Sequence, residues 1–225
     1  KEYIDNRKNK FLKFLRPVNL GYTNNSIDTK LISKFRQNYI PKKRADFLFV
    51  GRLTKKANIK LLIEALKLSK MNYKLNILGD MYDQKSSLIK KIKENNLAEK
   101  VIFHKFSNDE IKISKIFNSC KCFVYPGQVG LSIIHAMSYG LPSIIHNNRN
   151  HHNPENSAFS NELNGLFFEE NNAQSLAYIM DKLYNSPDKK LLLYSEESLK
   201  IIKENYSIDL MIENFNKSIR KIIHL

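Results

Sequence analysis

The sequence has few cysteines and no hydrophobic run long enough to cross a bilayer. Its two cysteines in 225 residues, Cys120 and Cys122, are poorly placed for a disulfide with each other or for a zinc site, and free thiols fit a reducing cytoplasm. No stretch of about 18 apolar residues exists, so no transmembrane helix is expected. Residues 1–5 show neither an initiating Met nor an apolar signal core, which argues against a secretory leader and indicates a fragment or a trimmed chain.

Acidic residues are too few to balance the basic ones. The chain has 22 Asp and Glu against 37 Lys and Arg, a formal net charge of +15. This excess would attract nucleic acid, anionic lipid head groups or phosphates, but the lysines are spread over nearly every predicted helix, as in any lysine-rich proteome. Residues 1–16 are the exception, because they combine basic residues with Phe11, Leu12, Phe14 and Leu15. They could form a membrane-surface helix or pack on another part of the protein.

From Asp46 onward, short apolar runs alternate with helical patterns. Ile59, Leu62, Ile63 and Leu66 have the spacing of one helix face. Apolar strands that alternate with helices predict an α/β domain, with a parallel sheet covered on both faces. Six strands are expected, at 47–50, 75–78, 101–103, 122–125, 143–145 and 166–168. Helices are expected near 59–66, 87–95, 111–118 and 131–139, and three more after residue 172.

The predicted domain organisation has one main unit. Residues 1–45 fit the alternating pattern poorly and are interpreted as a connector or the remnant of a missing N-terminal domain, whereas 46–225 form one domain with C-terminal helices. Ligands of parallel sheets bind beyond the carboxyl ends of the strands, near the point where strand order reverses. The loops after Val50, Leu78, Phe103, Tyr125 and Ile145 are therefore the places to search for a site.

The first of these loops is basic. Gly51 lets the backbone turn, Arg52 offers a fork that can grip a diphosphate, and Lys55 and Lys56 add mobile charges. Cations beside a helix N-terminus suit a phosphate. A solvated basic loop with no ligand is an equally good interpretation from local chemistry alone.

The loop after Tyr125 is rich in glycine and leads into a helix. Its glycines allow main-chain N–H groups to approach a ligand, and the start of the helix presents free N–H groups and the positive end of the dipole. A packing role for the glycine turn is the alternative. The candidate residues here are Gly127, Gln128, Val129, Gly130 and Leu131.

No P-loop and no Ser-His-Asp set are visible. His146, His151 and His152 cluster, but their spacing matches no zinc signature, so no metal is expected and a polar loop with a ligand-facing histidine is favoured.

The residues of several motifs, and the order in which the motifs occur, resemble those of the C-terminal domain of the group 1 (family 4) glycosyltransferases, which have the GT-B fold. The resemblance runs from about Asp46 to the C-terminus. Its residues are Phe49 to Leu53, Leu61 to Ala65, Leu75 to Asp80, Tyr125-Pro126 through Gly130-Leu131, His135 to Ile144 and Asn164 to Phe168.

The resemblance implies a Rossmann-like domain that binds a UDP- or GDP-sugar, without a metal or other cofactor, opposite an N-terminal domain that binds the acceptor. Arg52 would contact the donor diphosphate, with Lys55 or Lys56 assisting. Gly130 and Leu131 would offer backbone N–H groups to the phosphate or sugar. Lys105 and Phe106 would lie by the nucleobase, and the helix near 206–223 would reach toward the N-terminal domain.

Two positions of the main motif depart from the family, which usually has glutamates there. Gly127 stands where the first glutamate would meet the donor sugar, and His135 where the second would meet the ribose. An imidazole can still hydrogen-bond a hydroxyl, but Gly127 cannot replace a carboxylate. The family lysine expected at position 57 is replaced by Ala57.

We therefore expect the donor domain of a retaining glycosyltransferase of hexosyltransferase type, which serves a glycan or lipid-linked acceptor in polysaccharide or lipopolysaccharide synthesis. It would be cytoplasmic, or peripheral at the inner face of the membrane. The alternatives are a nucleotide-sugar-binding pseudoenzyme, another GT-B enzyme such as an epimerase, and a basic nucleic-acid-binding module. No nucleic-acid recognition motif supports the last, so nucleic acid is not an expected partner.

Overall fold

The computed structural model describes residues 23–80 and 85–223. The basic, partly apolar segment 1–16 lies outside the described residues. None of the helices within the described ranges is both long enough and apolar enough to cross a membrane. Cys120 and Cys122 are buried and free.

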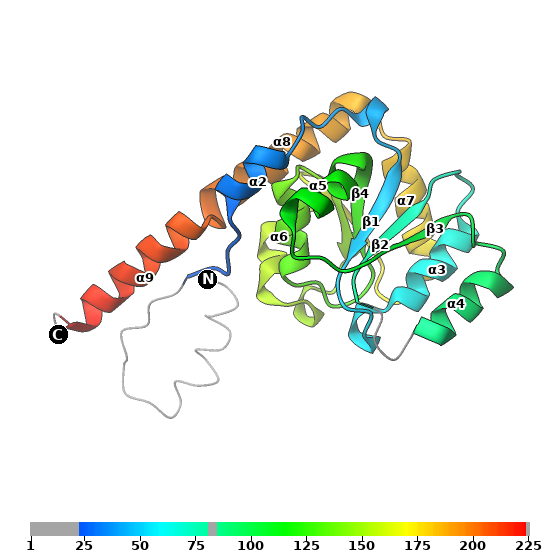
Figure 1. Cartoon of the computed structure of the whole chain (residues 1–225), viewed down its shortest axis with the longest axis horizontal. Helices are drawn as coiled ribbons and strands as arrows, with labels where there is room; N and C mark the ends of the chain where they lie inside the picture. Colours follow the sequence, from blue (N-terminus) through cyan, green and yellow to red (C-terminus); the bar gives the residue numbers. More distant parts are fainter. Residues whose placement is uncertain (1–22, 81–84, 224–225) are drawn as a thin grey trace.

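A six-stranded parallel sheet forms the centre of the domain, as the sequence predicts (Figure 1). The strands lie in the order β3-β2-β1-β4-β5-β6, so strand order reverses between β1 and β4. Their bounds are β1 Asp46–Val50, β2 Leu75–Leu78, β3 Val101–His104, β4 Cys120–Tyr125, β5 Ser143–His146 and β6 Gly165–Phe168.

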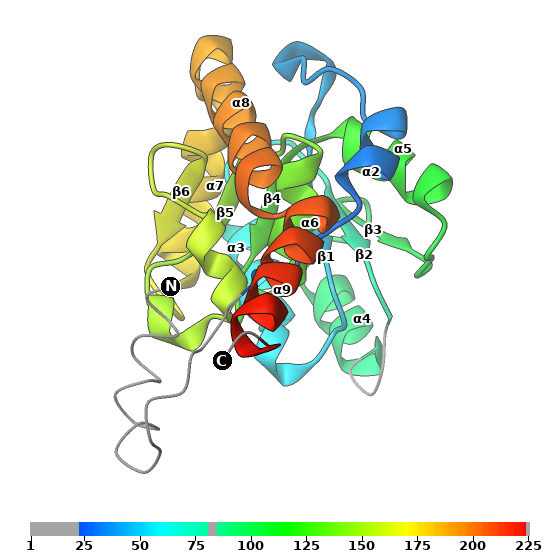
Figure 2. The ribbon, with the colours of Figure 1, turned by 90° about the vertical axis from the view of Figure 1, so that its left-hand side faces the viewer.

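Helices cover both faces of the sheet (Figures 1 and 2). On one face α3 (Ile59–Leu68) packs against α7 (Ala173–Tyr184) and, less closely, α4 (Lys85–Glu94). On the other lie α5 (Glu110–Ser119) and α6 (Leu131–Ser138). The predicted stripe of α3 is confirmed, because Ile59, Leu62, Ile63 and Leu66 are all buried. These buried faces are what fixes the loops at the carboxyl ends of the strands.

Residues ahead of the sheet pack on the same domain. The helix α2 (Thr29–Phe35) contacts α5, and the guanidinium of Arg36 donates to the carbonyl of Ser138 at 3.0 Å. After the short turn η1 (Pro41–Lys43), the buried Arg44 donates to the carbonyls of Phe117 and Cys120, each at 3.3 Å. The part of the predicted connector that the structure describes is therefore tied to α5, α6 and β4.

The two last helices leave the sheet. The helix α8 (Asp188–Asn205) packs on α6, and α9 (Ile208–Ile223) extends away from the body of the domain (Figure 1). The α9 side chains Ile212 and Phe215 are 50% and 58% exposed. With α7, these helices confirm the helical region predicted after residue 172.

Candidate functional site

A cavity of 540 Å³ lies beyond the carboxyl ends of β1 and β2, where parallel sheets place their ligands. Its wall combines apolar side chains with charged and polar ones contributed by the loops after β1, β2 and β3 and by α5 and α6. The lining residues are Val50, Gly51, Arg52, Leu78, Gly79, Asp80, Phe106, Ser107, Asn108, Glu110, Ile113 and His135.

Four predicted residues line this cavity: Gly51, Arg52, Phe106 and His135. Arg52 is exposed, and no acidic side chain within the described ranges pairs with it. It lies near enough to Tyr125 to pull the pKa of that phenol down, although burial prevails and raises it. Arg52 is thus a cation that no described side chain neutralises, and its guanidinium can bind an anion. Phe106 is 53% exposed and gives the cavity an aromatic surface.

The structure brings the two predicted phosphate loops together. The backbone N–H of Gln128 donates to the carbonyl of Lys56 at 2.9 Å. A Cβ placed on Gly127 would lie 2.0 Å from that same carbonyl oxygen. Gly127 therefore lets the β4–α6 loop rest on the short turn η2 (Lys55–Ala57), which holds the predicted lysines.

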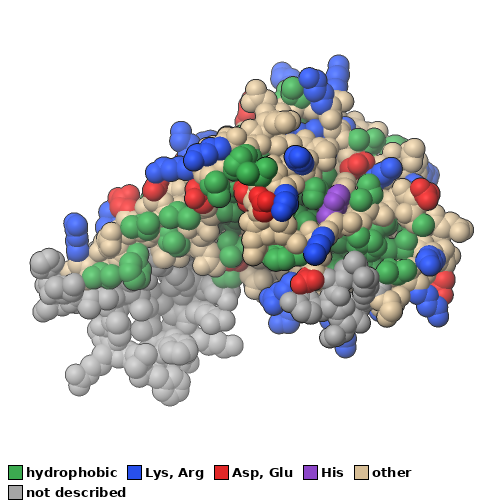
Figure 3. Space-filling view, viewed as in Figure 1, with side chains coloured by type: hydrophobic (Ala, Val, Ile, Leu, Met, Phe, Trp, Pro, Cys, Tyr) green, Lys and Arg blue, Asp and Glu red, His purple; other side chains and the backbone are tan. Residues whose placement is uncertain are grey.

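The other predicted residues lie outside the cavity wall. The side chains of Lys55, Lys56, Lys105 and Gln128 are exposed, and Val129 is fully buried. Lys and Arg side chains are scattered over the face of the molecule that Figure 3 shows, so the positive net charge forms no single basic patch on that face.

The start of α6 is open to a ligand. Gly130 is its N-cap residue, and within the described residues no side-chain hydrogen bond caps the helix. The first N–H groups of a helix have no intrahelical partner, and they carry the positive end of the dipole. Leu131, the first residue of α6, is 47% exposed. The predicted anion-binding character of Gly130 and Leu131 fits this geometry.

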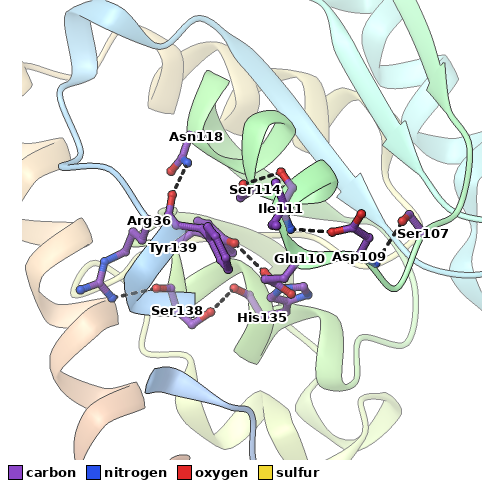
Figure 4. A network of polar contacts seen from close by, with 11 residues as sticks. Arg36, Ser107, Asp109, Glu110, Ile111, Ser114, Asn118, His135, Ser138 and Tyr139 are labelled. Atoms are coloured by element: carbon purple, nitrogen blue, oxygen red, sulfur yellow. Dashed lines mark hydrogen bonds and ion pairs between the residues drawn. The ribbon is translucent and has the colours of Figure 1, made fainter. Parts of the chain in front are cut away.

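A polar cluster joins α5 to α6 at the wall of the cavity (Figure 4). The Glu110 carboxylate oxygen Oε1 accepts from the Tyr139 hydroxyl at 2.5 Å and lies 3.0 Å from Nε2 of His135. Burial raises the pKa of Glu110, but the hydrogen bonds from His135 and Tyr139 outweigh it and leave the pKa below its ordinary value. The carboxylate is therefore ionised at neutral pH.

The histidine cluster after β5 supports the β4–α6 loop. Val129 donates its N–H to Nδ1 of His152 at 3.2 Å, and Nε2 of His152 lies 2.9 Å from the carbonyl oxygen of His146. His152 must be neutral, with its proton on Nε2, to make both bonds. Among the described residues, no group of three His, Cys, Asp or Glu side chains is placed to hold a metal ion.

Apart from Phe106, sequence reasoning missed the lining residues from the loops after β2 and β3, and it missed those from α5. Both loops are expected ligand sites by their place after strands, so Asp80, Ser107 and Asn108 could have been found from that rule. Glu110 carries no such signal, because a carboxylate in the first turn of a helix is ordinary.

Solved structures show the same fold at low sequence identity. A glycosyltransferase from Rickettsia africae superposes with a TM-score of 0.75 at 16% identity, over 89% of this chain and 56% of the other. HepE from Anabaena, solved with UDP and glucose, gives 0.72 at 18%, over 90% and 56%. The C-terminal domain of the group 1 protein LpcC from Francisella tularensis gives 0.66 at 20%, over 81% and 99%.

This chain thus spans about half of the first of these proteins and nearly all of the isolated C-terminal domain. No curated protein matches the sequence. The family model described as "Glycosyl transferases group 1" matches residues 32–207, most of the chain. With the parallel sheet and the cavity at its carboxyl edge, this match shows that the chain belongs to the group 1 glycosyl transferases.

Proposed function

We propose that this chain is the donor-binding domain of a retaining glycosyltransferase that takes its sugar from a UDP- or GDP-sugar. The observation that carries the proposal is the cavity at the carboxyl edge of the sheet, with Arg52 on its wall and no acidic partner for Arg52 among the described residues. At the end of the β4–α6 loop, the start of α6 has no side-chain cap among the described residues and presents N–H groups that have no partner within the helix. A guanidinium and free helix N–H groups are the groups that bind a diphosphate.

The proposed catalysis is electrostatic. When the bond from the anomeric carbon to the diphosphate oxygen breaks, the electron pair stays on the diphosphate, and Arg52 with the N–H groups of Gly130 and Leu131 stabilises that charge. Lys56, whose side chain is exposed on η2, supplies a mobile cation, with Lys55 beside it. The acceptor hydroxyl adds on the same face of the sugar and passes its proton to the leaving oxygen, so no enzymic base is required.

The acceptor and the rest of the protein belong to the same proposal. The exposed apolar residues of α9 fit contact with an N-terminal domain that binds a glycan or lipid-linked acceptor. One structural neighbour is the lipopolysaccharide outer core galactosyltransferase WaaB, of which this chain covers 59%. A role in surface polysaccharide synthesis, in the cytoplasm or at the inner face of the membrane, is consistent with that likeness. A nucleotide-sugar-binding protein without transfer is the second candidate, because Gly127 leaves no room for a carboxylate.

The Arg52→Ala variant should bind UDP or GDP at least tenfold more weakly than the wild type, because a charge-assisted contact to phosphate contributes on the order of 1.5–3 kcal/mol. Calorimetric titration with UDP, GDP and their sugar conjugates measures the loss. Lys115→Ala is the matched control, since it removes an exposed cation of α5 outside the cavity wall and should keep wild-type affinity.

Absence of nucleotide binding by the wild type, or equal affinity in the Arg52→Ala variant, would contradict the proposal. Salt-dependent binding of RNA without UDP or GDP binding would support a nucleic-acid-binding module instead. Release of free nucleotide from a bound sugar conjugate, with an acceptor present, separates a transferase from a protein that only binds the donor.

A further inference from the structure

The carboxylate of Glu110 is held rigidly on the cavity wall. It comes from the first residue of α5, and its side chain is 15% exposed. Its Oε1 accepts from Tyr139, the C-cap residue of α6, and contacts His135, which lies one turn earlier in that helix (Figure 4). The rings of Phe117 and His135 lie 4.5 Å apart, which packs the imidazole in place. Glu110 is therefore a fixed group that a ligand meets in one orientation.

Glu110 keeps its negative charge although it is partly buried. The two hydrogen bonds hold its pKa below the ordinary value, and the N-terminal end of α5 favours an anion at this position. The second oxygen, Oε2, has no hydrogen-bond partner among the described residues. It is also not among the polar side-chain atoms that are buried from solvent without a partner. An ionised oxygen with free lone pairs on a cavity wall accepts hydrogen bonds and repels phosphate.

The charges and side chains of the cavity wall assign the diphosphate, base and ribose of a nucleoside diphosphate to different places. The diphosphate belongs with Arg52 and the start of α6, where the charge is positive. The base fits the apolar side chains Phe106 and Ile113. The ribose is the part that always brings hydroxyl donors. His135 follows Leu131 by four residues, about 6 Å along the α6 axis, so the Glu110–His135 pair lies beyond the phosphate end of the helix.

We propose that Glu110 is the ribose-recognition residue of this site, accepting a hydrogen bond from a ribose hydroxyl at Oε2, while Tyr139 and His135 position its carboxylate. This inference rests on the proposed function, because it needs a nucleotide in the cavity. It assigns the acceptor of the ribose hydrogen bond to Glu110 of α5, whereas the sequence motif places its ribose-binding position at His135 of α6. A site of this kind discriminates against a nucleotide that lacks the hydroxyl, since the carboxylate then loses water without gaining a partner.

The test is calorimetric titration with UDP and GDP and with the 2′-deoxy and 3′-deoxy analogues of each. The wild type should bind one deoxy analogue at least tenfold more weakly than its parent. In Glu110→Gln that ratio should fall to about twofold or less, because the neutral amide accepts a weaker hydrogen bond. The Asp109→Asn variant is the matched control, because it changes the neighbouring carboxylate of the same helix start and should keep the wild-type ratio.

The Tyr139→Phe variant provides a second reading if Glu110→Gln folds poorly, as judged by circular dichroism. It leaves the carboxylate but removes one of the two groups that hold it, and should reduce the ratio to a value between wild type and Glu110→Gln. An unchanged ratio in Glu110→Gln, or in Tyr139→Phe where only that variant folds, overturns the inference while nucleotide binding stands. No nucleotide binding by the wild type overturns the proposed function and this inference with it.

Discussion

The Gly127→Ala variant is expected to lose about 3 kcal/mol or more of unfolding free energy, near the upper end of the usual cost of overpacking. The added Cβ would lie 2.0 Å from the carbonyl oxygen of Lys56 and 2.7 Å from the carbonyl carbon of Ala57. Both atoms belong to the backbone, so no side-chain rotation relieves the overlap. The turn cannot simply retreat, because Ala57 is fully buried and Gln128 is hydrogen-bonded to Lys56.

Urea unfolding followed by circular dichroism measures this loss. Gln128→Ala is the control in the same loop, because its side chain is exposed and its Cβ is already accommodated, so it should change stability by less than about 0.5 kcal/mol. Equal stability of wild type and Gly127→Ala would show that the two loops are not in contact as described. The same geometry predicts that Gly127→Glu will not introduce a donor-sugar carboxylate, since its Cβ meets the same atoms.

Short apolar runs made the sheet predictable. Leu75 to Leu78 is ended by Gly79 and becomes β2 with those bounds. The stop of α6 could also be predicted, because Gly140 takes a φ of +71°, which glycine adopts without strain. These features depend on neighbours in the sequence, which is why pattern reasoning finds them.

Features that depend on distant partners could not be found in the same way. Gly127 and Lys56 are far apart in the sequence, and a glycine after a strand predicts close approach of a ligand as readily as close approach of another loop. Glu110 resembles an ordinary helix-start carboxylate until the fold places it against His135, 25 residues later. The packing of the segment ahead of the sheet belongs to this class, since Arg36, just after α2, and Arg44, just after η1, find their carbonyl partners only in the folded domain.

The free energy of unfolding should fall by roughly 2 kcal/mol between pH 7 and pH 5, mainly through His146. This residue is 1% exposed, and the centroid of its ring lies 3.7 Å from that of His152. Burial and the neighbouring His152 lower the pKa of His146 from 6.5 to about 4. Below pH 6.5 the unfolded chain binds a proton at His146, whereas the folded chain binds it only near pH 4. The stability present at neutral pH is therefore lost as the pH falls. Burial also lowers the pKa of His152, which adds to the same slope.

Urea unfolding at several pH values between 7 and 5 measures this slope, and His146→Asn should flatten it by more than half. His151→Gln is the control, because it alters an exposed ring of the same cluster that contacts Glu170 and should leave the slope in place. A slope unchanged by His146→Asn would assign the titration to another group. The functional consequence follows from His152: a protonated ring cannot accept the N–H of Val129, so the loop before α6 loses its support at acidic pH. Nucleotide affinity of the folded protein should therefore weaken only as the pH falls through the lowered pKa of His152, at lower pH than the loss of stability begins, since the loop that presents the α6 N–H groups then loses this support.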